Sequence, residues 1–130
     1  MSSGTSPLTA FCNQLVRFFE ELRDTFPEER EIGAALETIQ GAKRVNPRLV
    51  LDMFYEHIAK DLRDVIMTEN IEQVLAYAKG KINKQFNEMM PAINIFDKHW
   101  ATMDDVNRNA IWKYLKVLIL LSDKARSVRV

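Results

Sequence analysis

The sequence predicts an all-α fold, a single compact bundle of about five to seven helices packed orthogonally or irregularly around an apolar C-terminal helix. Three observations predict this class. Apolar residues recur at spacings of three and four along most of the chain, which is the helical period. Proline or clusters of polar residues separate these periodic segments. No segment shows a sustained two-residue alternation bounded by hairpin turns.

The length of the chain predicts one domain, and its balanced charge favours a protein as the partner. The 130 residues suffice for a single hydrophobic core, so we expect residues 1–130 to form one helical domain with a polar tail at about 1–6 and a basic tail at about 124–130. The 18 basic and 18 acidic side chains cancel, which argues against steering toward nucleic acid or an anionic membrane. Cys12 is the only cysteine, and no secretory signal precedes it, so we expect a reducing compartment rather than secretion.

The first two helices begin with proline signals. Ser6 and Pro7 predict an N-cap and the first helical position of a helix that runs to about Thr25. Its apolar face consists of Leu8, Phe11, Cys12, Leu15, Phe19 and Leu22. We expect the second helix to open at Pro27 and to end near Gly41. A basic connector with Lys43 and Arg44 would follow it.

The third helix is predicted to lie deep in the bundle. Asn46 and Pro47 repeat the combination of a cap and a proline, and apolar positions then cover more than half of the helix circumference. These positions are Val50, Met53, Phe54, His57 and Ile58. A shorter helical piece with Leu62, Val65 and Ile66 should continue from it, interrupted or bent before residues 68–70.

The next spacing predicts a helix of about five turns from Ile71 to Met89, weakened but not broken by Gly80. Pro91 should stop or kink this helix, and a short helical stripe of Ile93, Phe96 and Trp100 follows.

Thr102 and Asp105 have the spacing of a capping box for the final helix. Residues 110–122 of that helix are apolar on nearly every side, yet the apolar run is too short to span a membrane. We expect it to pack against the first helix, the third helix and the 71–89 helix.

The sequence offers no catalytic pattern, so we expect a protein that is not an enzyme and binds no metal or cofactor. His57 and His99 lack a partner at a metal-binding spacing, and we expect a core histidine and a boundary histidine respectively. The carboxylate pairs Asp61 with Asp64 and Asp104 with Asp105 have the pattern of helix starts or solvated charge. We expect Cys12 to be a buried, unreactive thiol.

Candidate partner contacts lie on the last helix and in the basic tail. Leu120 projects between Lys113 and Lys116, in the polar sector of the final helix. The tail supplies Lys124, Arg126 and Arg129, and a second basic cluster consists of Lys79, Lys81 and Lys84. Neither cluster is interleaved with the aromatic residues that single-stranded nucleic-acid binders use for stacking.

Three phrases together resemble a group of small helical proteins of nucleocytoplasmic large DNA viruses that infect algae and protists. They are an amphipathic first helix that ends in Phe26-Pro27, the Asn46-Pro47 start of the third helix, and NAIWKYL at 109–115 followed by VLILLSDK. The resemblance spans most of the chain and carries no catalytic signature. It implies a viral protein in the virion or in the host cytoplasm, at the viral factory.

Three functions are therefore open. We expect a non-enzymatic structural or interaction protein, a minor capsid or virion-associated component whose partners are capsid or other virion proteins. The alternative is an intracellular regulatory adaptor that binds nucleic acid or the transcription machinery through its basic segments. A third possibility is a helical module whose groove takes up a partner helix.

Overall fold

The computed structural model of the chain describes residues 6–82 and 87–127, and it confirms the all-α class. The helices are α1 (Pro7–Thr25), α2 (Arg30–Val45), α3 (Pro47–Phe54), α4 (Lys60–Met67), α5 (Ile71–Ile82), α6 (Met90–His99) and α7 (Asp105–Ser127). A π-helical turn, η1 (Tyr55–Ala59), joins α3 to α4, and a 3-10 turn, η2 (Trp100–Thr102), follows α6.

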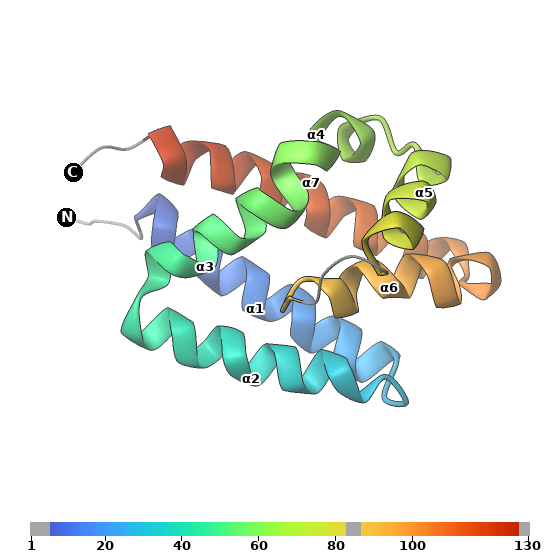
Figure 1. Cartoon of the computed structure of the whole chain (residues 1–130), viewed down its shortest axis with the longest axis horizontal. Coiled ribbons are helices and arrows are strands. Elements are labelled where there is room, and N and C mark those ends of the chain that lie inside the picture. The colour runs from blue at the N-terminus through green and yellow to red at the C-terminus, as the bar shows by residue number, and fades with distance from the viewer. Residues whose placement is uncertain (1–5, 83–86, 128–130) are drawn as a thin grey trace.

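Helix α1 lies along the middle of the bundle. It packs against α7 on one side and α2 on the other, and α3 crosses it (Figure 1). Helices α5 and α6 pack against each other toward the end of the molecule that is opposite the turn between α2 and α3. The elongated outline of the molecule therefore has two distinct ends.

The predicted bounds of α1 are confirmed by its cap and its buried stripe. The Ser6 Oγ accepts a hydrogen bond from the backbone N–H of Thr9 at 3.1 Å, and Pro7 occupies the first turn. Burial of the apolar stripe on several neighbours then holds the helix in place. The buried side chains are Phe11, Cys12, Leu15, Phe18, Phe19 and Leu22.

Both predicted bounds of the second helix are wrong. The chain turns at Pro27, where the N–H of Glu29 donates to the carbonyl of Phe26 at 3.0 Å, so α2 begins only at Arg30. The helix continues past Gly41 to Val45, because a glycine inside a helix weakens it without ending it. The two residues expected in a basic connector, Lys43 and Arg44, therefore form its last turn, where positive charge suits the helix dipole.

The third helix and the shorter piece after it are continuous from Pro47 to Met67 through the π-helical turn η1. The carbonyl oxygen of His57, inside this turn, accepts a hydrogen bond from the Tyr77 hydroxyl of α5 at 2.8 Å. That bond holds α5 against η1. The His57 side chain is only half-buried, so the expectation of a core histidine is wrong.

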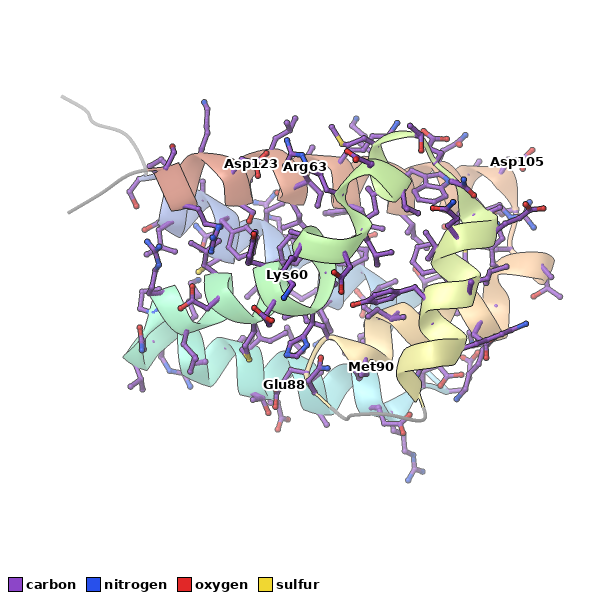
Figure 2. The ribbon with its side chains drawn as sticks, turned by 45° about the horizontal axis from the view of Figure 1, so that its top comes forward. Lys60, Arg63, Glu88, Met90, Asp105 and Asp123 are labelled. Atoms are coloured by element: carbon purple, nitrogen blue, oxygen red, sulfur yellow. The ribbon has the colours of Figure 1, made fainter. Side chains whose placement is uncertain are left out.

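The predicted five-turn helix to Met89 is wrong, because the chain turns before α6. The side-chain oxygen of Asn87 accepts a hydrogen bond from the N–H of Met89 at 2.8 Å, within a turn that leads into α6 at Met90. Pro91 lies in the first turn of α6, where a missing N–H is harmless, so it starts a helix rather than stopping one. Figure 2 shows Glu88 and Met90 at this start.

The cap of α7 is Asp104 and not the predicted Thr102. The Asp104 Oδ1 accepts from the N–H of Asn107 at 2.9 Å, whereas the Thr102 hydroxyl donates to the carbonyl of His99 at 3.2 Å. Arg108 then donates to the carbonyl of Trp100 through Nε at 3.0 Å and covers the indole ring, so η2 is fastened to the first turn of α7.

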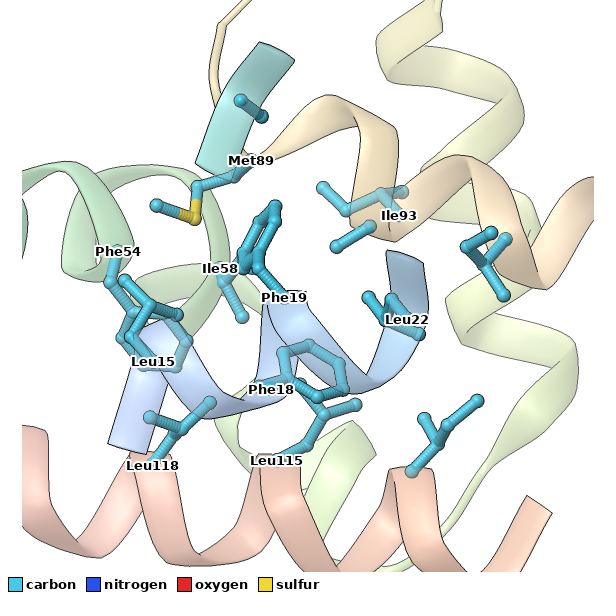
Figure 3. Close-up of a cluster of buried hydrophobic side chains, with 14 of the residues drawn as sticks. Leu15, Phe18, Phe19, Leu22, Phe54, Ile58, Met89, Ile93, Leu115 and Leu118 are labelled. Carbon is cyan, nitrogen blue, oxygen red and sulfur yellow. The ribbon is translucent and has the colours of Figure 1, made fainter. Parts of the chain in front are cut away.

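The core gathers side chains from the ends and middle of the chain. Phe11 and Phe54 meet edge to face with ring centroids 5.1 Å apart, which joins α1 to α3. Trp112 contacts Phe96 and Trp100 at centroid distances of 5.8 and 5.2 Å, which joins α7 to α6 and η2. Figure 3 shows how the buried cluster converges; its labelled members are Leu15, Phe18, Phe19, Leu22, Phe54, Ile58, Met89, Ile93, Leu115 and Leu118.

Helix α7 buries only part of its predicted apolar segment, because Tyr114, Val117 and Leu121 are half-buried. Ile111, Trp112, Leu115, Leu118 and Ile119 are all buried. Its main neighbours are α1, α3, η1 and α4, so α4 and η1 take the place that was expected for the 71–89 helix. The remaining side of α7 faces away from the bundle.

Candidate interaction surface

The side of α7 that faces away from the bundle carries a row of positions spaced by four and three residues. We call this row the outer seam; it consists of Val106, Ala110, Lys113, Val117, Leu120 and Lys124. Such spacing places the side chains on one face of a helix. The row lies opposite the buried side chains of α7, and in it a lysine follows each pair of apolar residues.

Leu120 and Val106 are the most exposed large apolar side chains of the outer seam. Leu120 is 52% exposed and Val106 is 77% exposed, whereas Leu118 and Ile119 beside Leu120 are fully buried. Two successive residues of a helix point about 100° apart, so the same helix can bury Ile119 and present Leu120 to water. Leu120 therefore lies on the exposed side of α7.

A hollow borders the outer seam between α1 and α7. It has a volume of about 260 Å³ and is lined by Gln14 of α1 and by Ala110, Lys113, Tyr114 and Val117 of α7. The Tyr114 ring packs on Phe18 of α1 with centroids 5.4 Å apart, which fixes its position.

The Tyr114 hydroxyl remains a hydrogen-bonding group beside this hollow. Burial raises the pKa of Tyr114, and the Glu21 carboxylate raises it further. The hydroxyl is therefore protonated near neutral pH and can both donate and accept a hydrogen bond. The hollow offers a partner an apolar wall, an ammonium group and a hydroxyl.

The structure gathers only some of the sequence-predicted contact residues on one face. Leu120, Lys113 and Lys124 lie on the outer seam and are exposed. Lys116 lies to one side, where its Nζ is 2.6 Å from Oε2 of Glu69 at the end of α4. Arg126 turns toward the bundle, with its guanidinium carbon 3.4 Å from the centroid of the Tyr55 ring.

Two further basic groups have separate positions. Lys124 and Arg126 belong to the last turns of α7, which runs to Ser127, and Arg129 lies outside the described residues. In the second cluster, Lys79 is exposed near the end of α5, whereas the side chains of Lys81 and Lys84 lie outside the described residues.

One group of possible metal ligands that the sequence does not predict occurs in the described part of the chain. Glu28, Glu29 and His99 each bring one ligand atom to within 4.8 Å of the others. The Nε2 of His99 lies 2.8 Å from Oε2 of Glu29 and 3.8 Å from Oε2 of Glu28. A separation of about 70 residues along the chain hides such a group from any reading of local spacing.

Ion pairs and stacking account for the arrangement of this group. Lys98 places its Nζ 3.2 Å from Oε1 of Glu29, and the His99 ring stacks on Phe26 with centroids 4.6 Å apart. Hydrogen bonding from His99 lowers the pKa of Glu29, burial opposes that shift, and Lys98 adds to it. These contacts fasten the turn between α1 and α2 to the end of α6.

The Cys12 thiol and the Asp61 carboxylate, two other groups that could carry chemistry, make hydrogen bonds within the fold. The Cys12 thiol is buried and donates to the carbonyl of Pro47 at 3.6 Å, and burial raises its pKa despite the nearby Lys43, which confirms the expected core thiol. Asp61 accepts from the Tyr77 hydroxyl at 3.3 Å, and its predicted companion Asp64 is exposed.

Comparisons with protein-family models, with curated proteins and with solved structures give no match to this chain. Within the described residues, none of the helices is both long and apolar enough to cross a membrane.

Proposed function

We propose that this chain is a non-enzymatic structural or interaction protein that binds a protein partner through the outer seam of α7. The observation that carries this proposal is the exposure of Val106 and Leu120 on the outer seam of a helix whose other large aliphatic side chains lie in the core or at its boundary. A contiguous apolar patch that is rimmed by polar residues is typical of protein contact sites. The hollow beside Tyr114 extends the same surface toward α1.

The outer seam fits an amphipathic helix of the partner. Its apolar positions recur with the heptad spacing that a second helix can follow, and α7 provides 23 residues of length. Lys113 and Lys124 interrupt the apolar row, so a partner with carboxylates opposite them would complement it.

The resemblance to proteins of large DNA viruses supports a place in the virion. A minor capsid or virion-associated protein needs a rigid body and a surface for a neighbouring protein, and the closely packed bundle with its outer seam offers both. The partners under this proposal are capsid or other virion proteins.

Replacing Leu120 tests the proposal. In virus carrying Leu120→Lys, we expect the protein to fold normally and to be depleted from purified particles, as measured by quantitative mass spectrometry and by thermal unfolding of the isolated protein. The matched control is Met67→Lys, which adds the same charge at an exposed apolar residue of α4 outside the outer seam. It should leave incorporation unchanged.

Three outcomes would contradict the proposal. Wild-type incorporation of Leu120→Lys would exclude the outer seam as the contact. Absence of the wild-type protein from particles would exclude a virion role. Tight binding to DNA or RNA that weakens steeply with salt would favour the regulatory adaptor instead.

A further inference from the structure

The charged residues of this neutral chain are separated along its length. One end, which we call the basic end, is formed where α2 passes into α3 and where α7 finishes (Figure 1). Its basic residues are Lys43, Arg44, Arg48, Lys124 and Arg126. The acidic residues nearby already have basic partners, because Asp52 lies 3.7 Å from Arg48 and Asp123 pairs with Arg63 (Figure 2).

The opposite end, which we call the acidic end, is formed by the turn between α1 and α2 together with the start of α7. Its acidic residues are Glu28, Glu29, Glu31, Asp104 and Asp105. The contacts of Glu29 with His99 and of Arg108 with Trp100 join these segments into one surface. Three basic residues, Arg30, Lys98 and Arg108, lie among these five acidic residues, so negative charge still prevails at this end.

Each end also exposes large apolar side chains. At the basic end Val45 is 86% exposed and Leu49 is 47% exposed, and they are interleaved with Arg44 and Arg48. At the acidic end Val106 is 77% exposed and follows directly after Asp104 and Asp105. Apolar contact sites with flanking charge of opposite sign thus occur at opposite ends of the same molecule.

We propose that copies of this chain associate head to tail, with the basic end of one copy seated on the acidic end of the next. Charge complementarity selects a second copy in this orientation, because a symmetric pair formed through either end would bring like charges together. A head-to-tail contact leaves one basic and one acidic end free, so it repeats into a chain or closes into a ring.

This association should be weak and sensitive to salt. The charged groups at both ends are mostly exposed, and exposed ion pairs contribute little individually. The Debye length falls from about 10 Å at 0.1 M salt to about 3 Å at 1 M, so added salt should dissociate the copies. The contact is separate from the middle of the outer seam, and its failure would leave the role of Leu120 untouched.

Sedimentation velocity of charge-reversed variants tests the proposal. The basic-end variant carries Arg44→Glu and Arg48→Glu, and the acidic-end variant carries Glu28→Lys and Asp105→Lys. We expect the wild-type sedimentation coefficient to rise with protein concentration at low salt and to return to the monomer value at about 1 M salt. Each variant alone should remain monomeric under both conditions.

A mixture of the two variants distinguishes the specific contact from general charge effects. The native acidic end of the first variant should bind the native basic end of the second, so the mixture should recover the wild-type sedimentation coefficient. The control carries Arg17→Glu and Lys79→Glu, which change the net charge as much as the basic-end variant but lie outside both ends; it should associate like wild type. A monomeric wild type at every concentration, or a mixture that stays monomeric, would overturn the proposal.

Discussion

Glu29 is the residue at which the contacts of the acidic end meet. Its carboxylate accepts hydrogen bonds from Lys98 and His99, and it is held against the end of α6. Hydrogen bonding from His99 is the largest cause of its lowered pKa. A carboxyl group whose pKa is lower in the folded state stabilises the fold above its unfolded pKa, and this contribution is lost as the pH falls through the folded pKa.

The substitution Glu29→Gln should therefore remove an acid-dependent part of the stability. The unfolding free energies of wild type and variant should differ most above the ordinary pKa of 4.5 and should converge as the pH falls below it. Urea unfolding at a series of pH values measures this difference. The control is Glu31→Gln, an exposed carboxylate in the first turn of α2, and an equal pH-dependent difference in both variants would contradict the assignment.

Single residues also show the limits of sequence reasoning at the site. Helical spacing singles out Leu120 as a candidate contact from the sequence, but its exposure depends on which face α1 and α3 cover. Lys113 and Lys116 both belong to the polar sector that the sequence predicts for the last helix. Of these two lysines, Lys116 forms the ion pair with Glu69. A contact between residues so far apart in the chain leaves no local signal.

At the level of single helices, the starts are set by individual hydrogen bonds. Asp104 supplies the acceptor for the N–H of Asn107 at the start of α7, while the hydroxyl of Thr102 serves the preceding 3-10 turn. An N-cap side chain satisfies a backbone donor that would otherwise lack a helical partner.

The substitution Asp104→Ala should lower the unfolding free energy by about 0.5–2 kcal/mol, because it removes this cap. Thr102→Ala should have a smaller effect, since its hydroxyl is exposed and makes one weak contact. Chemical denaturation of both variants measures the difference. A larger loss with Thr102→Ala would restore the capping box that the sequence predicted.

The residues at which helices end are hard to predict from the sequence, because glycine does not mark them reliably in this chain. Helix α4 ends in a tight turn in which the N–H of Asn70 donates to the carbonyl of Val65 at 2.9 Å. The residue in the left-handed conformation there is Glu69, with φ of 54°, where glycine is usual, so no glycine marks the stop. Gly41 shows the opposite case, a glycine that does not end its helix, because α2 continues past it to Val45.

At the scale of the whole molecule, Leu115 is the point where most of the helices converge. It borders a small apolar void together with residues of α1, η1, α4, α5 and α6 (Figure 3). Those residues are Phe18, Ile58, Leu62, Ile66, Val74, Ala92, Ile93 and Phe96. A side chain that is shared by so many helices supports the whole bundle rather than one contact.

The substitution Leu115→Ala should cost about 2–5 kcal/mol of unfolding free energy, because it enlarges a void in a closely packed core. Lys113→Ala, on the exposed side of the same helix, should change the stability by less than about 0.5 kcal/mol. Equilibrium unfolding followed by tryptophan fluorescence measures both. Near-wild-type stability of Leu115→Ala would show that α7 is peripheral to the fold.

The sequence by itself determined the all-α class, the start of α1 at Pro7, the start of α3 at Pro47 and the apolar character of α7. These features depend on helical periodicity, on proline geometry and on the need to bury apolar side chains, all of which are local properties of the chain. Only the tertiary structure decided that Leu120 faces outward, that His99 meets Glu29, and that the charges of a neutral chain separate into two ends. Those features depend on the packing of distant segments, which no local spacing specifies.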